Sequence, residues 1–200
     1  MKVILSLIFV CTILIASGQS KNAYIRISPR DHRYLEYSDG KPYIPIGLNL
    51  IGMGRFGTDS GFVQIENLLQ KLSKNKGNYF RIWLSDKFFD IEHTKSGKYD
   101  EVKAERLDKV IQMAAKYNLH IKGTIEHFRH FNKEPAWSAK ALHDIKNGGT
   151  ATSIKDFFIG NASKELYKRK LDWYAKRYAS DPTIYTWELW NEVNTVQGGG

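Results

Sequence analysis

The sequence predicts an α/β fold in which parallel strands alternate with helices, as in a (β/α)8 TIM barrel truncated after about its fourth strand. Four apolar segments have the character of strands, and three amphipathic segments that of helices. The connections that follow strands are long, notably 85–100 and 128–160, whereas those that precede strands are short. Long loops at the carboxyl ends of parallel strands are typical of a barrel's functional face.

The four expected strands are apolar runs rich in β-branched and aromatic residues. They lie at 44–50, 78–84, 119–125 and 184–190. Apolar residues at helical spacing predict three helices, around 62–72, 107–115 and 167–178. Strands that alternate with helices imply right-handed crossovers and therefore a parallel sheet.

Composition divides the chain into three segments. Residues 1–18 are almost entirely apolar and end in the small residues Ala16-Ser17-Gly18, which predicts a secretory signal peptide and a secreted or periplasmic protein. The stretch is too short for a spanning helix, so no stable membrane association is expected after cleavage. Residues 19–42 alternate around an Asp39-Gly40 turn and predict an N-terminal extension with a β-hairpin. Residues 43–200 form the predicted half barrel.

The formal net charge of +9 comes from basic residues scattered through helices that also contain Asp and Glu, for example Lys164, Lys168 and Lys170. Because no nucleic-acid-binding motif accompanies them, we expect a solvated helical surface and no nucleic-acid partner. The chain's one cysteine, Cys11, lies in the predicted leader, so no disulfide is expected in the mature protein.

A glycine pattern, Gly52-x-Gly54-x-x-Gly57, follows the first expected barrel strand and matches a nucleotide-binding motif. Its neighbours are bulky, and the next strand does not end in the acidic residue that would bind a ribose. We therefore expect a barrel loop at this position and predict no cofactor.

The most informative segment is the last strand, which ends in Asn191 and Glu192. A barrel presents its functional groups at the carboxyl tips of its strands. Glycosidic bond cleavage needs a carboxylic acid to protonate the leaving oxygen, and a neighbouring amide can bind the sugar 2-hydroxyl. The segment therefore predicts Glu192 as a general acid/base and Asn191 as a substrate-binding residue. We also expect the flanking tryptophans to shield Glu192 from water, which favours a protonated carboxyl.

The segment Trp187–Glu192, with the sequence WELWNE, resembles the fourth-strand signature of the retaining (β/α)8 glycoside hydrolases. It is most similar to glycoside hydrolase family 5, which includes cellulases and β-mannanases. The resemblance covers about residues 30–195 and implies a polysaccharide or oligosaccharide substrate, with Glu192 as acid/base and Asn191 at the 2-hydroxyl. It also implies a nucleophile, a Glu on the seventh strand, beyond Gly200, so that this chain is expected to be inactive alone.

Other residues are assigned to the site by the same resemblance. Arg81 resembles the clan's second-strand arginine that supports the nucleophile, and His127 lies where family 5 members often place a histidine that contacts substrate. Trp83 and Trp190 are predicted to bind substrate, with packing as the alternative for each, and the alternative for His127 is a core histidine with satisfied hydrogen bonds. A structural ion pair is the alternative for Arg81, because an arginine in an apolar strand needs a partner. Glu188, deeper in its strand, is expected to form such a pair or a hydrogen bond inside the barrel.

Three alternatives remain open. The first is a carbohydrate-binding barrel without catalysis, which a downstream strand ending in Gln or Ala would favour. The second is a metal-dependent hydrolase, although residues 47–50 lack the His-x-His pair typical of such barrels. Its candidate ligands are Glu126, His127, His130 and His143. The third makes Glu126 the nucleophile, which is disfavoured because adjacent strands would place both carboxylates on one side of the bond. Trp137, in the third loop, is a further candidate sugar platform.

Overall fold

The computed structural model describes residues 23–53, 58–127 and 141–195, and its centre is a four-stranded parallel sheet. The strands are β4 (Gly47–Leu50), β5 (Tyr79–Trp83), β6 (His120–Glu126) and β7 (Ile184–Trp190). They pair in chain order, and each pair is parallel. The predicted strands and their parallel arrangement are confirmed, and the last strand has the predicted bounds.

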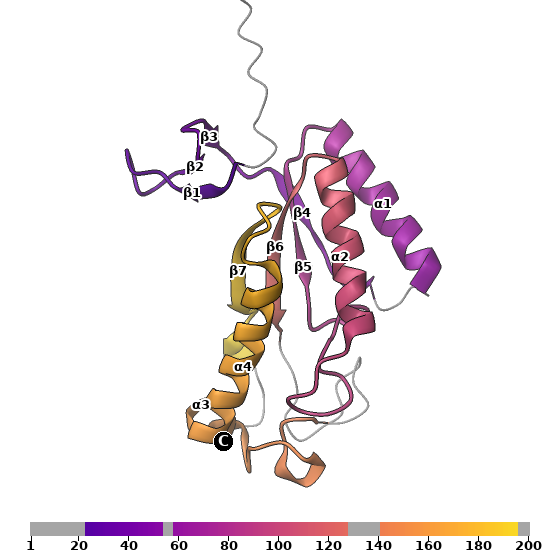
Figure 1. Cartoon of the computed structure of the whole chain (residues 1–200), viewed down its shortest axis with the longest axis vertical. Helices are drawn as coiled ribbons and strands as arrows, with labels where there is room; N and C mark the ends of the chain where they lie inside the picture. Colours follow the sequence, from indigo (N-terminus) through magenta and orange to yellow (C-terminus); the bar gives the residue numbers. More distant parts are fainter. Residues whose placement is uncertain (1–22, 54–57, 128–140, 196–200) are drawn as a thin grey trace, which may run out of the picture.

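The strands are connected through α1 (Thr58–Lys74), α2 (Glu101–Lys116) and α4 (Asn161–Tyr178), as the sequence predicts. Helices α1 and α2 lie next to each other on one side of the sheet (Figure 1). Helix α2 begins after Asp100, whose side chain accepts hydrogen bonds from two backbone amides of the first turn. Such a cap satisfies donors that the start of a helix leaves without partners.

The main core lies between the sheet and the helices. Phe80 and Ile82 of β5 are at most 1% exposed and pack in one cluster with Val110 of α2. Since side chains alternate along a strand, Arg81 and Trp83 lie on the opposite face of the sheet. The side chain of Arg81 therefore points away from the helices. In a barrel, this face of the sheet is the inner one.

The N-terminal extension forms a small antiparallel sheet of three strands, β1 (Ile25–Ile27), β2 (Leu35–Tyr37) and β3 (Pro42–Tyr43). The expected hairpin joins β2 and β3. Its turn contains Gly40, whose φ of 88° lies in the left-handed region that glycine adopts most readily.

This small sheet packs against the beginnings of the later barrel strands. The ring centroid of Tyr43 lies 5.5 Å from that of His120 and 5.6 Å from that of Tyr185. The hydroxyl of Tyr24 donates a hydrogen bond to the carbonyl of Ser180 at 2.7 Å. The small sheet therefore lies at the end of the parallel sheet opposite the carboxyl tips of the strands (Figure 1).

The connection between β6 and β7 contains a helix that the sequence did not predict. After a short 3-10 turn, η2 (Ile145–Asn147), the chain forms α3 (Ile154–Ile159) before it enters α4. The side chain of Ser153 caps α3 by accepting a hydrogen bond from the Asp156 amide. Six residues are too few for helical periodicity to stand out from the surrounding loop.

Several predicted features lie outside the described residues. They are the signal peptide at 1–18, Gly54 and Gly57 of the glycine pattern, His130 and Trp137. Within 23–53, 58–127 and 141–195, no helix is both long enough and apolar enough to cross a membrane.

Candidate active site

The predicted site residues lie on three adjacent strands, Arg81 in the middle of its strand and the others at or just past the carboxyl ends. They are Arg81 and Trp83 on β5, His127 directly after β6, and Trp190, Asn191 and Glu192 at the end of β7. Neighbouring parallel strands end at the same edge of a sheet, so residues far apart in sequence meet there. The clearest case is the hydrogen bond between Arg81 and Asn191, which are 110 residues apart.

Arg81 connects the interior of the sheet with the tip of β7. Its Nε donates a hydrogen bond to Oε2 of Glu188 at 2.7 Å, and its Nη2 donates one to Oδ1 of Asn191 at 2.6 Å. A guanidinium holds its donors in one rigid plane, so these two bonds orient both acceptors together. Arg81 is thus a structural ion-pair partner of Glu188 and at the same time a direct neighbour of the predicted substrate-binding amide.

Asn191 is 7% exposed and is held at two points. Its backbone N–H donates to the carbonyl of Glu126 at 2.8 Å, and its side-chain oxygen accepts from Arg81. Its Nδ2 has no hydrogen-bond partner within the described part of the chain. Because the oxygen is engaged by Arg81, the amide keeps its N–H donors for another acceptor.

Glu188 is a fixed anion inside the sheet. Besides the bond from Arg81, its Oε2 accepts a hydrogen bond from the Thr124 hydroxyl at 2.9 Å and lies 3.5 Å from Nζ of Lys122. Burial raises the pKa of Glu188, but the hydrogen bonds from Arg81 and Thr124 and the charges of Arg81 and Lys122 outweigh it, so the pKa lies below its ordinary value. The expected ion pair of Glu188 is confirmed.

Glu192 is exposed and lies just beyond the strand. Its φ of 50° places a non-glycine residue in the left-handed region. A residue with a Cβ in this region carries a strain on the order of 1–3 kcal/mol, and such strain is concentrated at functional sites. The chain therefore leaves the sheet through a strained turn at the predicted acid/base.

The tryptophans of the motif pack against helices. The ring centroid of Trp190 lies 5.7 Å from that of Phe157 and 5.4 Å from that of Phe158, both on α3. Trp187 lies 5.8 Å from Tyr174 of α4. The rings of these tryptophans pack against helices and Glu192 is exposed in this chain, so the four strands described do not by themselves provide the expected shielding of Glu192. A sugar contact of Trp190 remains a prediction.

His127 and Trp83 form a stacked pair at the same edge. Their ring centroids are 4.3 Å apart, with an interplanar angle of 24°. His127 is fully buried, its Nδ1 is hydrogen-bonded to the Ser85 hydroxyl, and its backbone N–H donates to that hydroxyl oxygen at 3.1 Å. Trp83 is only partly buried, so it presents the accessible surface of the pair.

A buried ionic cluster beside the site was missed by the sequence analysis. Lys170 of α4 is 2% exposed and donates a hydrogen bond to Oε1 of Glu126, and its Nζ lies 3.2 Å from Oε2 of Glu92. The expectation of a solvated Lys170 is wrong. The available signal was spacing, because Lys170 shares one helix face with Leu166 and Tyr174.

Two of the residues considered as metal ligands do meet, in a different combination. The ligand atoms of Glu126 and His143 lie, together with those of Glu92, within 4.8 Å of one another. Lys170 already provides a cation for both carboxylates, whereas His127 is bonded to Ser85. This arrangement favours an ion-paired cluster over a metal centre.

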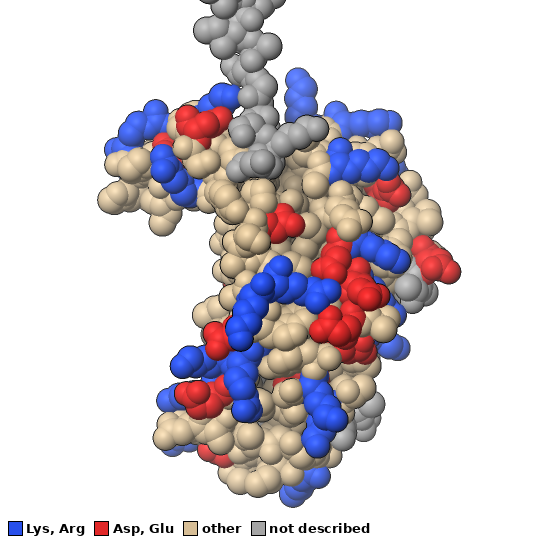
Figure 2. Space-filling model, viewed as in Figure 1, with Lys and Arg blue, Asp and Glu red and all other residues tan. Residues whose placement is uncertain are grey.

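Basic and acidic side chains are interspersed over the helical surface (Figure 2). Arg177 of α4 donates hydrogen bonds to Glu101 at 2.8 Å and to Asp108 at 2.7 Å, both on α2. Lys116 forms a 2.6 Å ion pair with Glu66. Pairing of this kind lowers the local excess of positive charge that the composition suggests.

Comparison with known proteins identifies relatives along most of the chain. Residues 38–199 match the family model described as Cellulase (glycosyl hydrolase family 5). Mannan endo-1,4-beta-mannosidase 4 of Solanum lycopersicum is 31% identical over 140 residues, which are 65% of this chain and 34% of that protein. Mannan endo-1,4-beta-mannosidase 8 of Oryza sativa subsp. japonica is 26% identical over 170 residues, or 78% of this chain and 44% of that protein. The chain thus spans less than half the length of these relatives.

Solved structures are similar at the level of the fold. The endo-1,4-beta-mannanase from Rhizomucor miehei superposes with a TM-score of 0.58 at 23% identity, covering 80% of this chain and 46% of its own. The beta-mannanase from the blue mussel Mytilus edulis gives a TM-score of 0.58 at 15% identity, with coverages of 86% and 46%. These likenesses confirm the predicted fold class, a (β/α)8 barrel of which this chain supplies four strands. Together with the family match over residues 38–199, they show that the chain belongs to the cellulase family, glycosyl hydrolase family 5.

Proposed function

We propose that the protein hydrolyses β-glycosidic bonds in a mannan-type polysaccharide by a retaining double-displacement mechanism, with Glu192 as general acid/base. The observation that carries the proposal is the pair Asn191–Glu192 at the carboxyl tip of β7, with Asn191 oriented by Arg81 at 2.6 Å and Glu192 exposed beside it. Family membership supports the reaction class. The names of the relatives, mannan endo-1,4-beta-mannosidases, support the substrate.

In the first step, the Glu192 carboxyl donates its proton to the glycosidic oxygen as the bond from that oxygen to C1 breaks. A second carboxylate attacks C1 from the opposite face and forms a glycosyl ester. In the second step, the Glu192 carboxylate accepts a proton from a water molecule, which attacks C1 and releases the second carboxylate.

Asn191 and Arg81 act on the sugar next to this bond. The Nδ2 of Asn191 donates a hydrogen bond to the 2-hydroxyl oxygen, and this interaction strengthens in the transition state. Arg81 keeps the amide in that orientation because it occupies Oδ1 of Asn191. The substrate contacts proposed for Trp83 and Trp190 belong to the binding of the remaining sugar units, and the fully buried His127 supports the ring of Trp83 from behind.

The second carboxylate is proposed to lie outside this chain. Glu126 is a counter-ion of Lys170, and Glu188 is a counter-ion of Arg81. A retaining reaction needs two carboxyl groups about 5–5.5 Å apart that flank the bond. We therefore keep the nucleophile on the seventh barrel strand, beyond Gly200, and expect this chain alone to be inactive.

The proposal includes export of the protein. Residues 1–18 have the composition of a signal peptide, which directs a protein to export and is then removed. N-terminal sequencing of the exported protein is expected to begin at Gln19. A protein that retains residues 1–18 would contradict this part of the proposal.

The test is an assay of the full-length protein for reducing-sugar release from β-mannan, mixed-linkage β-glucan, laminarin and xylan. We expect β-mannan to be cleaved best and Glu192→Gln to lower the rate by about 10²–10⁴-fold, as removal of a general acid/base does. Glu165→Gln, at an exposed position of α4, is the matched control and should retain activity. Wild-type protein that binds mannan without cleaving it would instead indicate a carbohydrate-binding barrel. Equal rates for Glu192→Gln and wild type would exclude Glu192 as the acid/base.

A further inference from the structure

Next to the tip of β6, the buried ammonium group of Lys170 forms ion pairs with Glu92 and Glu126, and the charge of a third buried acid, Asp90, also acts on it. Lys170 is 2% exposed, and Asp90, Glu92 and Glu126 are 0%, 3% and 1% exposed. Burial lowers the pKa of Lys170, but the charges of Glu126, Glu92 and Asp90 outweigh burial and hold the pKa well above its usual value. Lys170 is therefore a permanent cation inside the protein.

The cluster connects segments that are far apart in sequence. Glu126 ends β6, and Lys170 lies on α4, the helix that leads into β7. Glu92 lies in the connection after β5, where its Oε1 accepts a hydrogen bond from the amide of Gly97 at 2.6 Å. Separating buried charges of opposite sign leaves each without compensation in a medium of low dielectric, so the ion pairs hold these segments together.

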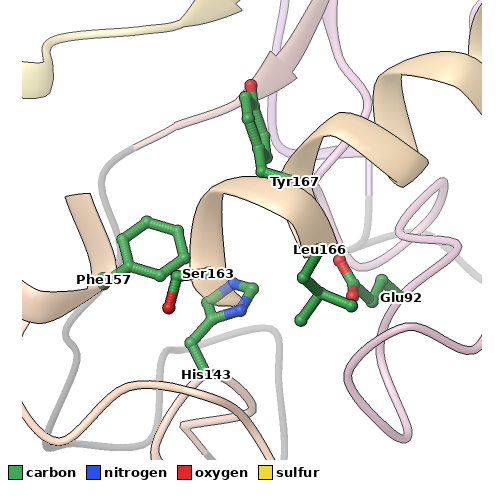
Figure 3. Close-up of a pocket in the computed structure, with 6 residues that line it drawn as sticks. All are labelled: Glu92, His143, Phe157, Ser163, Leu166 and Tyr167. Atoms are coloured by element: carbon green, nitrogen blue, oxygen red, sulfur yellow. The ribbon is translucent and has the colours of Figure 1, made fainter. Parts of the chain in front are cut away.

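A small pocket lies beside the cluster. It is formed by α3, α4, the loop that contains His143 and the loop that contains Glu92 (Figure 3). Its lining residues are Glu92, His143, Phe157, Ser163, Leu166 and Tyr167. The His143 ring packs on Phe157 at 4.5 Å between centroids. The side chains of Lys170, Glu92 and Glu126 are at most 4% exposed, and electrostatic interactions are stronger where water is excluded.

The backbone of Glu126 joins this cluster to the proposed active site. Its carbonyl oxygen accepts the hydrogen bond from the N–H of Asn191 at 2.8 Å, and Glu126 also pairs with Trp190 in the last register position between β6 and β7. Asn191 is followed directly by Glu192 with its left-handed φ of 50°. The backbone that carries the two proposed site residues is therefore anchored on the same residue whose side chain Lys170 holds.

We propose that Lys170, acting through Glu126, is a positioning residue for Asn191 and Glu192. The proposal rests on the function proposed above and extends it to a residue that lies behind the site on α4 and is itself buried. Without Lys170, the Glu126 carboxylate would move away from Glu92 and Asp90 or take up a proton. In either case the backbone of Glu126 loses the constraint that fixes its carbonyl oxygen under Asn191.

Three variants of the full-length protein separate positioning from charge balance. Lys170→Met removes the cation and leaves the carboxylates uncompensated. The double variant Lys170→Met/Glu126→Gln removes one charge of each sign, so it restores the charge balance without restoring the ammonium–carboxylate contact. Lys168→Met is the matched control, because Lys168 lies on the same helix and is exposed.

The first measurement is amide hydrogen exchange at Asn191, which does not depend on activity. We expect exchange about tenfold faster or more in the Lys170→Met and double variants, since local opening exposes the amide. Lys168→Met should exchange like the wild type. Unchanged exchange at Asn191 in a folded Lys170→Met protein would overturn the proposal, and if that variant does not fold, the charge-balanced double variant decides in the same way.

The second measurement is steady-state kinetics on β-mannan. We expect kcat to fall by about 10²-fold in both variants while KM changes little, because misplacement of a catalytic group by about 1 Å has an effect of this size. A double variant that regains both wild-type kcat and wild-type Tm would show that Lys170 only balances charge, and would refute its positioning role. If wild-type protein has no glycosidase activity, the proposed function fails, whereas the exchange experiment still decides whether Lys170 positions Asn191.

Discussion

Glu188 and Glu192 lie near the end of the same strand, yet their surroundings are opposite. Glu188 is within the hydrogen-bonded part of β7, where Arg81 and Thr124 bind its carboxylate and hold its pKa below the ordinary value. Glu192 lies past the end of the strand, is exposed and has a left-handed backbone. One short motif thus provides a structural anion with a lowered pKa and a carboxyl group at the surface.

The end of the strand causes this difference. Within the sheet the backbone is extended, and the register opposite β6 places Glu188 beside Thr124. The hydrogen-bonded strand ends at Trp190. The left-handed backbone at Glu192 means that its side chain no longer follows the in-and-out alternation of the strand. The same residue type is therefore half-buried in an ion pair at one position and exposed at the other, where we propose that it acts in catalysis.

The largest expected effect tests the two roles directly. Glu192→Gln should lower kcat/KM by about 10²–10⁴-fold, while its free energy of unfolding should change by no more than about 0.5 kcal/mol, as at other exposed positions. Parallel kinetics and denaturant titrations of the full-length protein measure both quantities. A Glu192→Gln variant that loses stability in proportion to activity would contradict the contrast with Glu188, because Glu192 would then have a structural role as well.

Arg81→Met should affect the carboxylate of Glu188 and the amide of Asn191, the direct neighbour of Glu192. It removes the donor to Glu188 and the donor to Asn191, so we expect a loss of about 1–3 kcal/mol in the free energy of unfolding, together with lower activity. Arg81→Lys retains the charge but lacks the planar donor pair, so it should recover more stability than activity. Equal recovery of both in Arg81→Lys would show that charge alone, and not the orientation of Asn191, is required.

Glu188→Gln should affect stability in a way that depends on pH. Because the folded-state pKa of Glu188 is depressed, ionised Glu188 stabilises the fold above the unfolded-state pKa of about 4.3, and this contribution is lost as the pH falls through the lower folded-state value. We expect the variant to be about 1 kcal/mol less stable than wild type at neutral pH. The difference should shrink in acid, which unfolding curves at several pH values will measure. A difference that stays constant down to acid pH would mean that the charge of Glu188 contributes nothing.

The smallest expected effect concerns the backbone at Glu192. Since left-handed φ is strained for any residue with a Cβ, Glu192→Gly should be more stable than Glu192→Ala by about 0.5–1 kcal/mol. At Glu188, in the extended strand, the order should be reversed, with Ala more stable than Gly. Thermal unfolding of the four variants compares them. An Ala variant that is the more stable one at both positions would contradict the strained turn.

Much of this arrangement was readable from sequence because it depends on local patterns. The apolar run that ends in Asn191 and Glu192 predicted both the strand and the position of the two polar residues at its tip. The ion pair of Glu188 also followed, since a carboxylate in an apolar strand needs a partner. The packing of Trp190 on α3 did not follow, because α3 itself is too short to be predicted and an aromatic residue suits a sugar site and a core equally well.

By itself, the sequence determined the order of strands and helices, the parallel sheet and the candidate acid/base, because each is encoded in residues that are close together in the chain. Only the tertiary structure decided which distant groups meet. Arg81 reaches Asn191 because adjacent strands end at one edge, and Lys170 is buried because Glu92 and Glu126 converge on it from two other segments. A buried lysine is stable only with such partners, and the sequence of its own helix does not contain them.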